Sequence, residues 1–152
     1  MLTLTRPTAT PQSVLPVALT THLETTMPER TISLPAAEIV LADGEIYAGI
    51  LLGQNGAPDH HLILLPGEAE SVTWAKAKEF AKKAGGELPT RREQSLLFAN
   101  LKEEFKGAWY WTRERHASVA SFAWCQYFTS GNQYDNHVSL QGRARAVRRL
   151  PI

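Results

Sequence analysis

The sequence has a single cysteine, Cys125, and no run of apolar residues long enough to cross a membrane. One thiol excludes an intrachain disulfide and a multi-cysteine metal site, and it favours a reducing compartment. The N-terminus lacks the basic-then-apolar order of a signal peptide. We therefore expect no membrane insertion, and we favour the cytoplasm or a virion as the location.

A glycine-rich phosphate loop is also missing, and the net charge is only +1. The charge is nevertheless uneven, because residues 1–90 hold 6 basic and 10 acidic side chains, whereas residues 91–152 hold 10 and 5. Two interpretations are open: a basic face for nucleic acid, or two halves that pair electrostatically within one domain. We favour the second interpretation.

The 152 residues, 43% of them hydrophobic and 20% charged, suit one domain with a sizeable core. Residues 1–30 contain eight Thr and four Pro with no sustained period, which predicts an extended arm. Such an arm is a candidate contact between subunits of a homo-oligomer. Residues 31–152 are expected to form the folded, ligand-binding domain.

Two amphipathic helices are predicted in the middle of this domain. The first, in "SVTWAKAKEFAKKAGG", has apolar residues spaced three and four apart: Trp74, Ala77, Ala81 and Ala84. Glycines end it, because a left-handed residue past the last turn favours glycine. The second begins at Thr90, which forms a capping box with Glu93, and extends to Phe105 through Leu97 and Leu101.

Short runs with strand character surround the helices: "TISL", "EIYAGILL" and "HHLILLPG" before them, and "WYWT", "SFAWCQYF" and "RARAVRRL" after them. Adjacent strand residues point to opposite faces, so we interpret His60 and His61 as structural rather than as a metal pair. We expect Trp124 in the core. The order of strands, two helices and strands predicts an α+β fold.

The segments "GGELPTRREQSLLFANL", "WYWT", "FAW" and "RARAVRRL" resemble a bacterial and prophage domain family of unknown function. The C-terminal domain of the Legionella collagen-like adhesin is of this type, which is distantly similar to formylglycine-generating enzymes. The resemblance covers about residues 45–150. It implies a C-type-lectin-like fold with two helices and short antiparallel strands, in which Trp111 and Trp124 belong to the scaffold and residues 143–150 form the last strand.

The residue types between His116 and Leu140 are restricted. Codons that end in a pyrimidine encode every position there except Trp124, Gln126 and Gln133. This is the palette of a diversity-generating retroelement, which mutates adenines in a variable repeat, and C-type-lectin-like domains are the usual targets of such systems. The resemblance therefore implies a mutable binding surface. Ordinary loops also favour Ser, Asn, Asp and Tyr, so a fixed binding surface is the alternative.

The same residues suit recognition, because tyrosine offers rigid contact area while Ser, Thr, Asn and His adapt their hydrogen bonds. We predict a non-catalytic binding module for a protein or cell-surface ligand, with no cofactor. We predict no metal, since Asp135 and Asn136 supply too few oxygen ligands for calcium. The predicted contact residues are Arg113, Glu114, His116, Tyr127, Thr129, Asn132, Tyr134, Asp135, Asn136, His137, Ser139 and Gln141.

Two other functions stay open. A nucleic-acid-binding surface would use "RARAVRRL" together with Arg91, Arg92, Arg113 and Arg115. An enzyme would use Cys125 as nucleophile with His116 or His137 as its base. We favour neither, because a lone thiol among aromatic residues is usually inert packing, and because we expect the arginines to pair with the acidic half of the chain.

Overall fold

The computed structural model describes residues 37–152. The predicted arm over residues 1–30, its contact in a homo-oligomer and the strand at "TISL" lie outside the described residues. The described part is α+β, as predicted. Its elements are β1 (Ile46–Leu51), β2 (His60–Leu64), β3 (Ala69–Val72), α1 (Trp74–Lys83), α2 (Arg91–Leu101), a 3₁₀ turn (Lys102–Glu104), β4 (Trp109–Arg115), β5 (Phe122–Tyr127), β6 (Gln133–His137), β7 (Gly142–Ala144) and β8 (Val147–Pro151).

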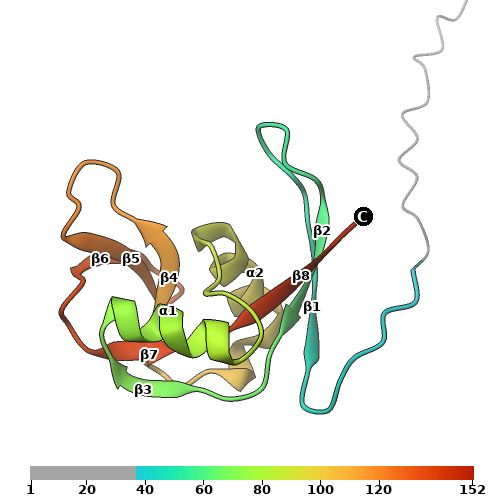
Figure 1. Cartoon of the computed structure of the whole chain (residues 1–152), viewed down its shortest axis with the longest axis horizontal. Helices are drawn as coiled ribbons and strands as arrows, with labels where there is room; N and C mark the ends of the chain where they lie inside the picture. Colours follow the sequence, from blue (N-terminus) through green and yellow to red (C-terminus); the bar gives the residue numbers. More distant parts are fainter. Residues whose placement is uncertain (1–36) are drawn as a thin grey trace, which may run out of the picture. The chain divides into compact units, whose positions relative to one another are not determined.

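The strands form two open sheets (Figure 1). One has the order β1-β2-β8 and the other β3-β7-β4-β5-β6. All pairs are antiparallel except β4 with β7, which are parallel where Tyr110 lies opposite Arg143. Helix α2 packs against β1 of the first sheet and against β4 and β5 of the second, whereas α1 packs against β3, β7 and β4. Neither helix is long and apolar enough to cross a membrane.

Helix α1 forms where the apolar spacing predicts it. Trp74, Ala77 and Ala81 are buried, and they pack against Trp111 and Cys125 of the five-stranded sheet. The small alanines let the helix approach the sheet closely, because they bury apolar surface without losing side-chain entropy. Gly85 follows the helix with φ of 89°, a conformation that glycine adopts without steric cost.

Helix α2 begins with the predicted capping box. The Thr90 hydroxyl accepts from the Glu93 amide at 3.2 Å, and the Glu93 carboxylate accepts from the Thr90 amide at 2.8 Å. The prediction that this helix reaches Phe105 is wrong, because Leu101 leaves the helical region with φ of −134° and one 3₁₀ turn follows. Phe105 is still buried, and its ring stacks on Phe128 with the centroids 3.9 Å apart.

Two strands have no counterpart in the sequence prediction, β3 and β6. They are the two outer strands of the five-stranded sheet. An outer strand needs neither a fully apolar face nor partners on both sides, so polar segments such as "AESV" and "QYDNH" pair with β7 and β5 without showing hydrophobic alternation.

The prediction of one strand for "RARAVRRL" is also wrong. Residues 142–144 belong to the five-stranded sheet and residues 147–151 to the three-stranded sheet. The chain crosses between the sheets at Arg145 and Ala146, where the Leu65 amide donates to the Ala146 carbonyl at 2.9 Å. Arg145 is buried there, and its guanidinium donates to the Glu104 carbonyl at 2.6 Å. Arginines from this segment therefore do not form one continuous stripe.

The two scaffold tryptophans differ in position. Trp111 is fully buried, and its indole nitrogen donates to the Val72 carbonyl at 2.9 Å. Trp124 is only half-buried, so its prediction as a core residue is wrong. On β5 the small residues Ala123 and Cys125 pack into the core on the α1 side, and the buried Gln126 lies on the opposite face because side chains alternate along a strand.

Candidate functional site

Several predicted contact residues meet on the side of β5 and β6 that faces α1. The register pairs Cys125 with Tyr134 and Ala123 with Asn136, so these four side chains share one face of the sheet. Beyond the part that α1 covers, this face has a hollow of about 430 Å³, lined by Trp109, Cys125, Tyr127, Ser130, Tyr134 and Asn136. We call these six residues the β5–β6 hollow.

The tyrosines of the β5–β6 hollow present their rings to solvent, with Tyr127 37% and Tyr134 50% exposed. The Tyr134 hydroxyl is oriented by the Asn132 side-chain amide at 3.1 Å. Asn136 is half-buried, and its amide nitrogen lies 3.3 Å from the Cys125 sulfur. The hollow therefore combines aromatic area with hydrogen-bonding groups and contains no charged side chain.

Sequence reasoning missed three lining residues, Trp109, Cys125 and Ser130. Trp109 precedes Trp111 by two positions, and its cross-strand partner is Tyr127. This spacing in "WYWT" was a signal that both tryptophans point to one side. Ser130 lies in the turn between β5 and β6, where no periodic pattern indicates which way a side chain points.

The other predicted contact residues on and beside β6 do not line the β5–β6 hollow. Asp135 is paired with Trp124 and His137 with Phe122, so both lie on the opposite face of β6. Thr129, Ser139 and Gln141 are exposed in the connections that flank β6, and the His137 ring nitrogen lies 2.7 Å from the Ser139 hydroxyl.

The predicted contact residues Arg113, Glu114 and His116 lie in three different environments. β4 leaves its regular register with β5 after Trp111, and the Arg113 amide donates to the Pro89 carbonyl at 2.9 Å. The Arg113 guanidinium then pairs with Glu87 at 2.8 Å. Glu114 accepts from the first backbone amide of α2. His116 stacks on Trp124 with the centroids 5.7 Å apart.

The face of β5 and β6 that meets α2 is closed by hydrogen bonds. The buried Gln126 side chain donates to the Gln94 carbonyl of α2 at 3.0 Å and accepts from Gln133 at 2.7 Å. The Gln133 amide also lies 2.7 Å from the Arg91 carbonyl. The Arg91 guanidinium covers the Trp124 ring, with its carbon 3.6 Å from the ring centroid. These contacts fix β6 against α2.

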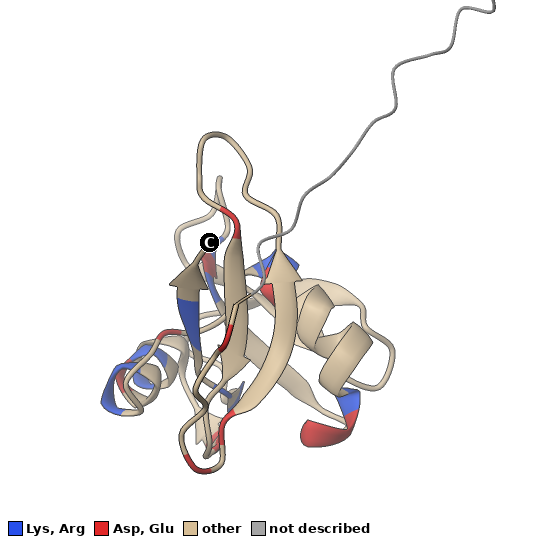
Figure 2. Ribbon diagram, turned by 90° about the vertical axis from the view of Figure 1, so that its right-hand side faces the viewer, with Lys and Arg blue, Asp and Glu red and all other residues tan. Residues whose placement is uncertain are grey.

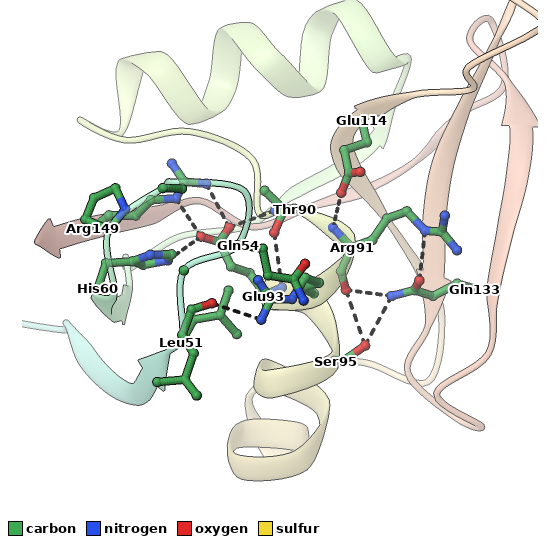
Figure 3. A pocket seen from close by; sticks show the side chains of 15 residues that line it. Leu51, Gln54, His60, Thr90, Arg91, Glu93, Ser95, Glu114, Gln133 and Arg149 are labelled. Carbon is green, nitrogen blue, oxygen red and sulfur yellow. Dashed lines mark hydrogen bonds and ion pairs between the residues drawn. The ribbon is translucent and has the colours of Figure 1, made fainter. Parts of the chain in front are cut away.

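A cleft of about 480 Å³ lies at the N-terminus of α2, bordered by the segment after β1 and by β8 (Figure 3). Its buried Glu93 carboxylate bonds to Arg149 at 2.6 and 2.7 Å and to His60 at 2.9 Å. Burial opposes the charged form of Glu93, but hydrogen bonds and attraction from Arg149 outweigh it and hold the pKa of Glu93 below its ordinary value. We call Glu93, Arg149 and His60 the Glu93 cluster. Because these paired groups join α2, β2 and β8, we interpret the cluster as structural.

Cys125 is buried, and this burial raises the pKa of its thiol to about 12. His116 and His137, the proposed bases of an enzyme, are absent from the hydrogen-bond partners of Cys125 in residues 37–152. Within the same residues, no group of three or more His, Cys, Asp or Glu side chains is placed to hold a metal ion.

Arginines near the C-terminus pair with carboxylates of the acidic half, as the charge distribution predicts. Arg143 lies 2.8 Å from Glu68, and Arg148 lies 2.7 Å from Glu45. Arg149 pairs with Glu87 of the acidic half and also with Glu93, which lies in the basic half. Figure 2 shows acidic and basic segments interspersed on this side of the molecule. The terminal arginines therefore do not present a surface of uncompensated charge.

Neither a model of a known protein family nor a curated protein matches this chain.

Proposed function

We propose that the domain is a non-catalytic binding module that presents the β5–β6 hollow to a protein or cell-surface ligand. The observation that carries the proposal is the convergence of Tyr127, Tyr134 and Asn136 around one hollow on an otherwise well-packed sheet. An α+β arrangement with two helices and mostly antiparallel strands is compatible with the C-type-lectin-like fold that the resemblance implies. That fold is part of the proposal.

The chemistry of the hollow favours a neutral ligand surface with hydrogen-bonding groups, such as a loop of a protein. Tyrosine contributes large apolar contact area at low entropic cost, and its hydroxyl adapts to donors or acceptors. Asn136 and Ser130 add amide and hydroxyl groups at the border. A charged ligand would lose hydration here without gaining an ion pair.

We further propose that a retroelement diversifies this surface. Between His116 and Leu140, the three residues that adenine mutation cannot reach are Trp124, Gln126 and Gln133, and all three lie on the face that meets α2. The exposed positions of the hollow belong to the reachable set. Ala123 and Cys125 are buried, yet adenine mutation can reach them. Burial therefore does not separate the reachable from the unreachable residues. The feature that supports the proposal is that the unreachable residues contact α2.

Site-specific photocrosslinking tests the binding surface. A photoreactive phenylalanine analogue replaces Tyr134, and the protein is irradiated on intact bacterial cells. The control carries the same analogue at Tyr47 of β1, which is 40% exposed. We expect one defined covalent adduct from position 134 and none from position 47. The adduct should disappear when Tyr127 and Asn136 are replaced by serine in the same chain, because a few anchors dominate an interface.

Equal adducts from both positions, or an adduct that survives the two serine substitutions, would place binding outside the hollow.

The retroelement has a separate test in the neighbouring DNA. We expect a reverse-transcriptase gene beside a near-copy of the codons for residues 113–150, with differences only at adenines. Differences at other bases would contradict diversification and leave a fixed binding module.

A further inference from the structure

A second hollow, of about 470 Å³, lies between α1 and the segment that leads into α2. Its lining residues are Trp74, Lys78, Lys82, Gly86, Glu87, Leu88 and Arg113. Trp74, Lys78 and Lys82 follow each other at intervals of four residues, so they lie along one side of α1. We call this the Trp74 hollow. It shares no lining residue with the β5–β6 hollow.

Cations gather around the tryptophan of this hollow. The Lys78 ammonium lies 3.7 Å from the centroid of the Trp74 ring, and the Arg115 guanidinium carbon lies 4.9 Å from it. The indole nitrogen donates to the Thr112 carbonyl at 2.8 Å, which fixes the ring between α1 and β4. Three cations line the hollow itself, Lys78, Lys82 and Arg113, whereas Arg115 lies against the Trp74 ring without lining the hollow.

These cations have little compensating charge. Within residues 37–152, no carboxylate lies within 4.0 Å of Lys78, Lys82 or Arg115. Arg113 pairs with Glu87, but Glu87 also pairs with Arg149. Figure 2 shows basic residues over much of α1, at the lower left of that view. Like charges held together in a concave site raise the local concentration of anions.

We propose that the Trp74 hollow binds a small ligand with a multivalent phosphate group, such as a diphosphate ester. Guanidinium groups match phosphate oxygens with paired hydrogen bonds, and ammonium groups add compact charges. The volume of the hollow falls in the range of small-molecule sites, about 300–1,000 Å³. A ligand with two or more negative charges offsets the excess of three lining cations over one lining carboxylate.

The arrangement favours a compact phosphate over a polynucleotide. A polynucleotide needs basic residues that follow its backbone over several phosphates. The arginines that could extend the surface, Arg143, Arg148 and Arg149, already pair with carboxylates. Of the cations without a carboxylate partner, Lys78 and Arg115 lie against the Trp74 ring, and Lys82 lies one turn along the same side of α1 as Lys78.

Calorimetric titration of the full chain with inorganic pyrophosphate and with ADP, at about 0.15 M salt, tests the proposal. We expect saturable 1:1 binding of both. Lys78→Gln combined with Lys82→Gln should weaken it at least tenfold, because each substitution removes a charged hydrogen-bond donor. The matched control is Lys76→Gln with Lys83→Gln, which removes the same charge from α1 but alters no lining residue. We expect the control to stay within about twofold of the parent.

The single variant Lys82→Gln separates a loss of binding from a loss of stability, because Lys78 contacts the Trp74 ring and Lys82 does not. It should weaken binding and leave the melting temperature unchanged. Absence of binding to both phosphate probes, or equal weakening by the two double variants, would overturn the proposal. Binding of an oligothymidylate through Lys78 and Lys82 without binding of pyrophosphate or ADP would also overturn it, in favour of a polynucleotide surface.

Discussion

Strands β5 and β6 meet a helix on each face, and the two faces differ in what the helix does. On the α2 side, Gln126 and Gln133 are hydrogen-bonded to the helix backbone. On the α1 side, the helix covers Ala123 and Cys125, and Tyr127 and Tyr134 beyond it border an open hollow. The same pair of strands can therefore carry scaffold residues on one face and candidate binding residues on the other, because successive side chains point to opposite faces.

The largest expected effect contrasts two tryptophans of the scaffold. Trp111→Ala should lower the free energy of unfolding by about 4 kcal/mol, because it leaves a cavity in the core and an unpaired Val72 carbonyl. Trp124→Ala should lower the free energy of unfolding by about 1–2 kcal/mol, because the variant loses a half-buried ring and the contact of that ring with Arg91. Urea denaturation of both variants measures the difference. Equal losses would mean that Trp124 is a core residue after all.

The second prediction concerns the hydrogen bonds on the α2 side. Gln126→Ala should destabilise by about 2 kcal/mol, because it removes a buried side chain that bonds to the Gln94 carbonyl and to the part-buried Gln133 amide. Gln126→Met keeps the volume and should show the hydrogen-bond loss with little cavity cost. Thermal melting of both variants is the measurement. A Met variant as stable as the parent would assign the whole effect to packing.

The third prediction concerns the loss of stability at low pH, which depends on the ion-paired carboxyl groups of the scaffold. The pKa of Glu93 is lowered in the folded protein, and that of Glu45 is lowered to about 2, mainly by its bond to Arg148. A carboxyl group with a lowered folded pKa stabilises above its unfolded pKa, about 4.3, and this stabilisation is lost as the pH falls through the folded pKa. Stability should therefore decline from about pH 4 toward pH 2.

Glu93→Gln should be less stable at pH 7, and its stability should decline less steeply below pH 4, because it removes one of these two carboxyl groups. Denaturation at a series of pH values gives the slopes. The matched control is Glu79→Gln on the exposed side of α1, which should retain the slope of the parent. A Glu93→Gln variant with the parental slope would contradict the role of the Glu93 cluster.

The smallest effect on stability is expected on the open side. Replacing Tyr127, Tyr134 and Asn136 together by serine should change the free energy of unfolding by no more than about 0.5 kcal/mol per residue, because these side chains border solvent. Thermal melting checks this, and His137→Ser serves as a control on the opposite face of β6. A triple variant that unfolds would show that the hollow is part of the scaffold.

Features that depend on neighbours within about four residues could be predicted from the sequence. The capping box of Thr90 and Glu93, the buried face of α1, the glycine after it and the α+β order all follow from spacing. These are local interactions, and their geometry is set by helix periodicity and backbone sterics. The strands β1 and β2 were predictable from short apolar runs, and β4 and β5 from alternation, because both patterns are local.

The contacts between distant segments depend on long-range packing and could not be predicted from local patterns. The polar strand β6 forms because β5 offers it a partner, and "RARAVRRL" divides because its two halves pair with different sheets. The ion pair of Arg148 with Glu45 joins residues 103 positions apart. The same long-range packing brought Trp109 beside Tyr127 and Tyr134 and moved His137 to the opposite face. No local pattern encodes such contacts, because their energy depends on the register and curvature of the assembled sheets.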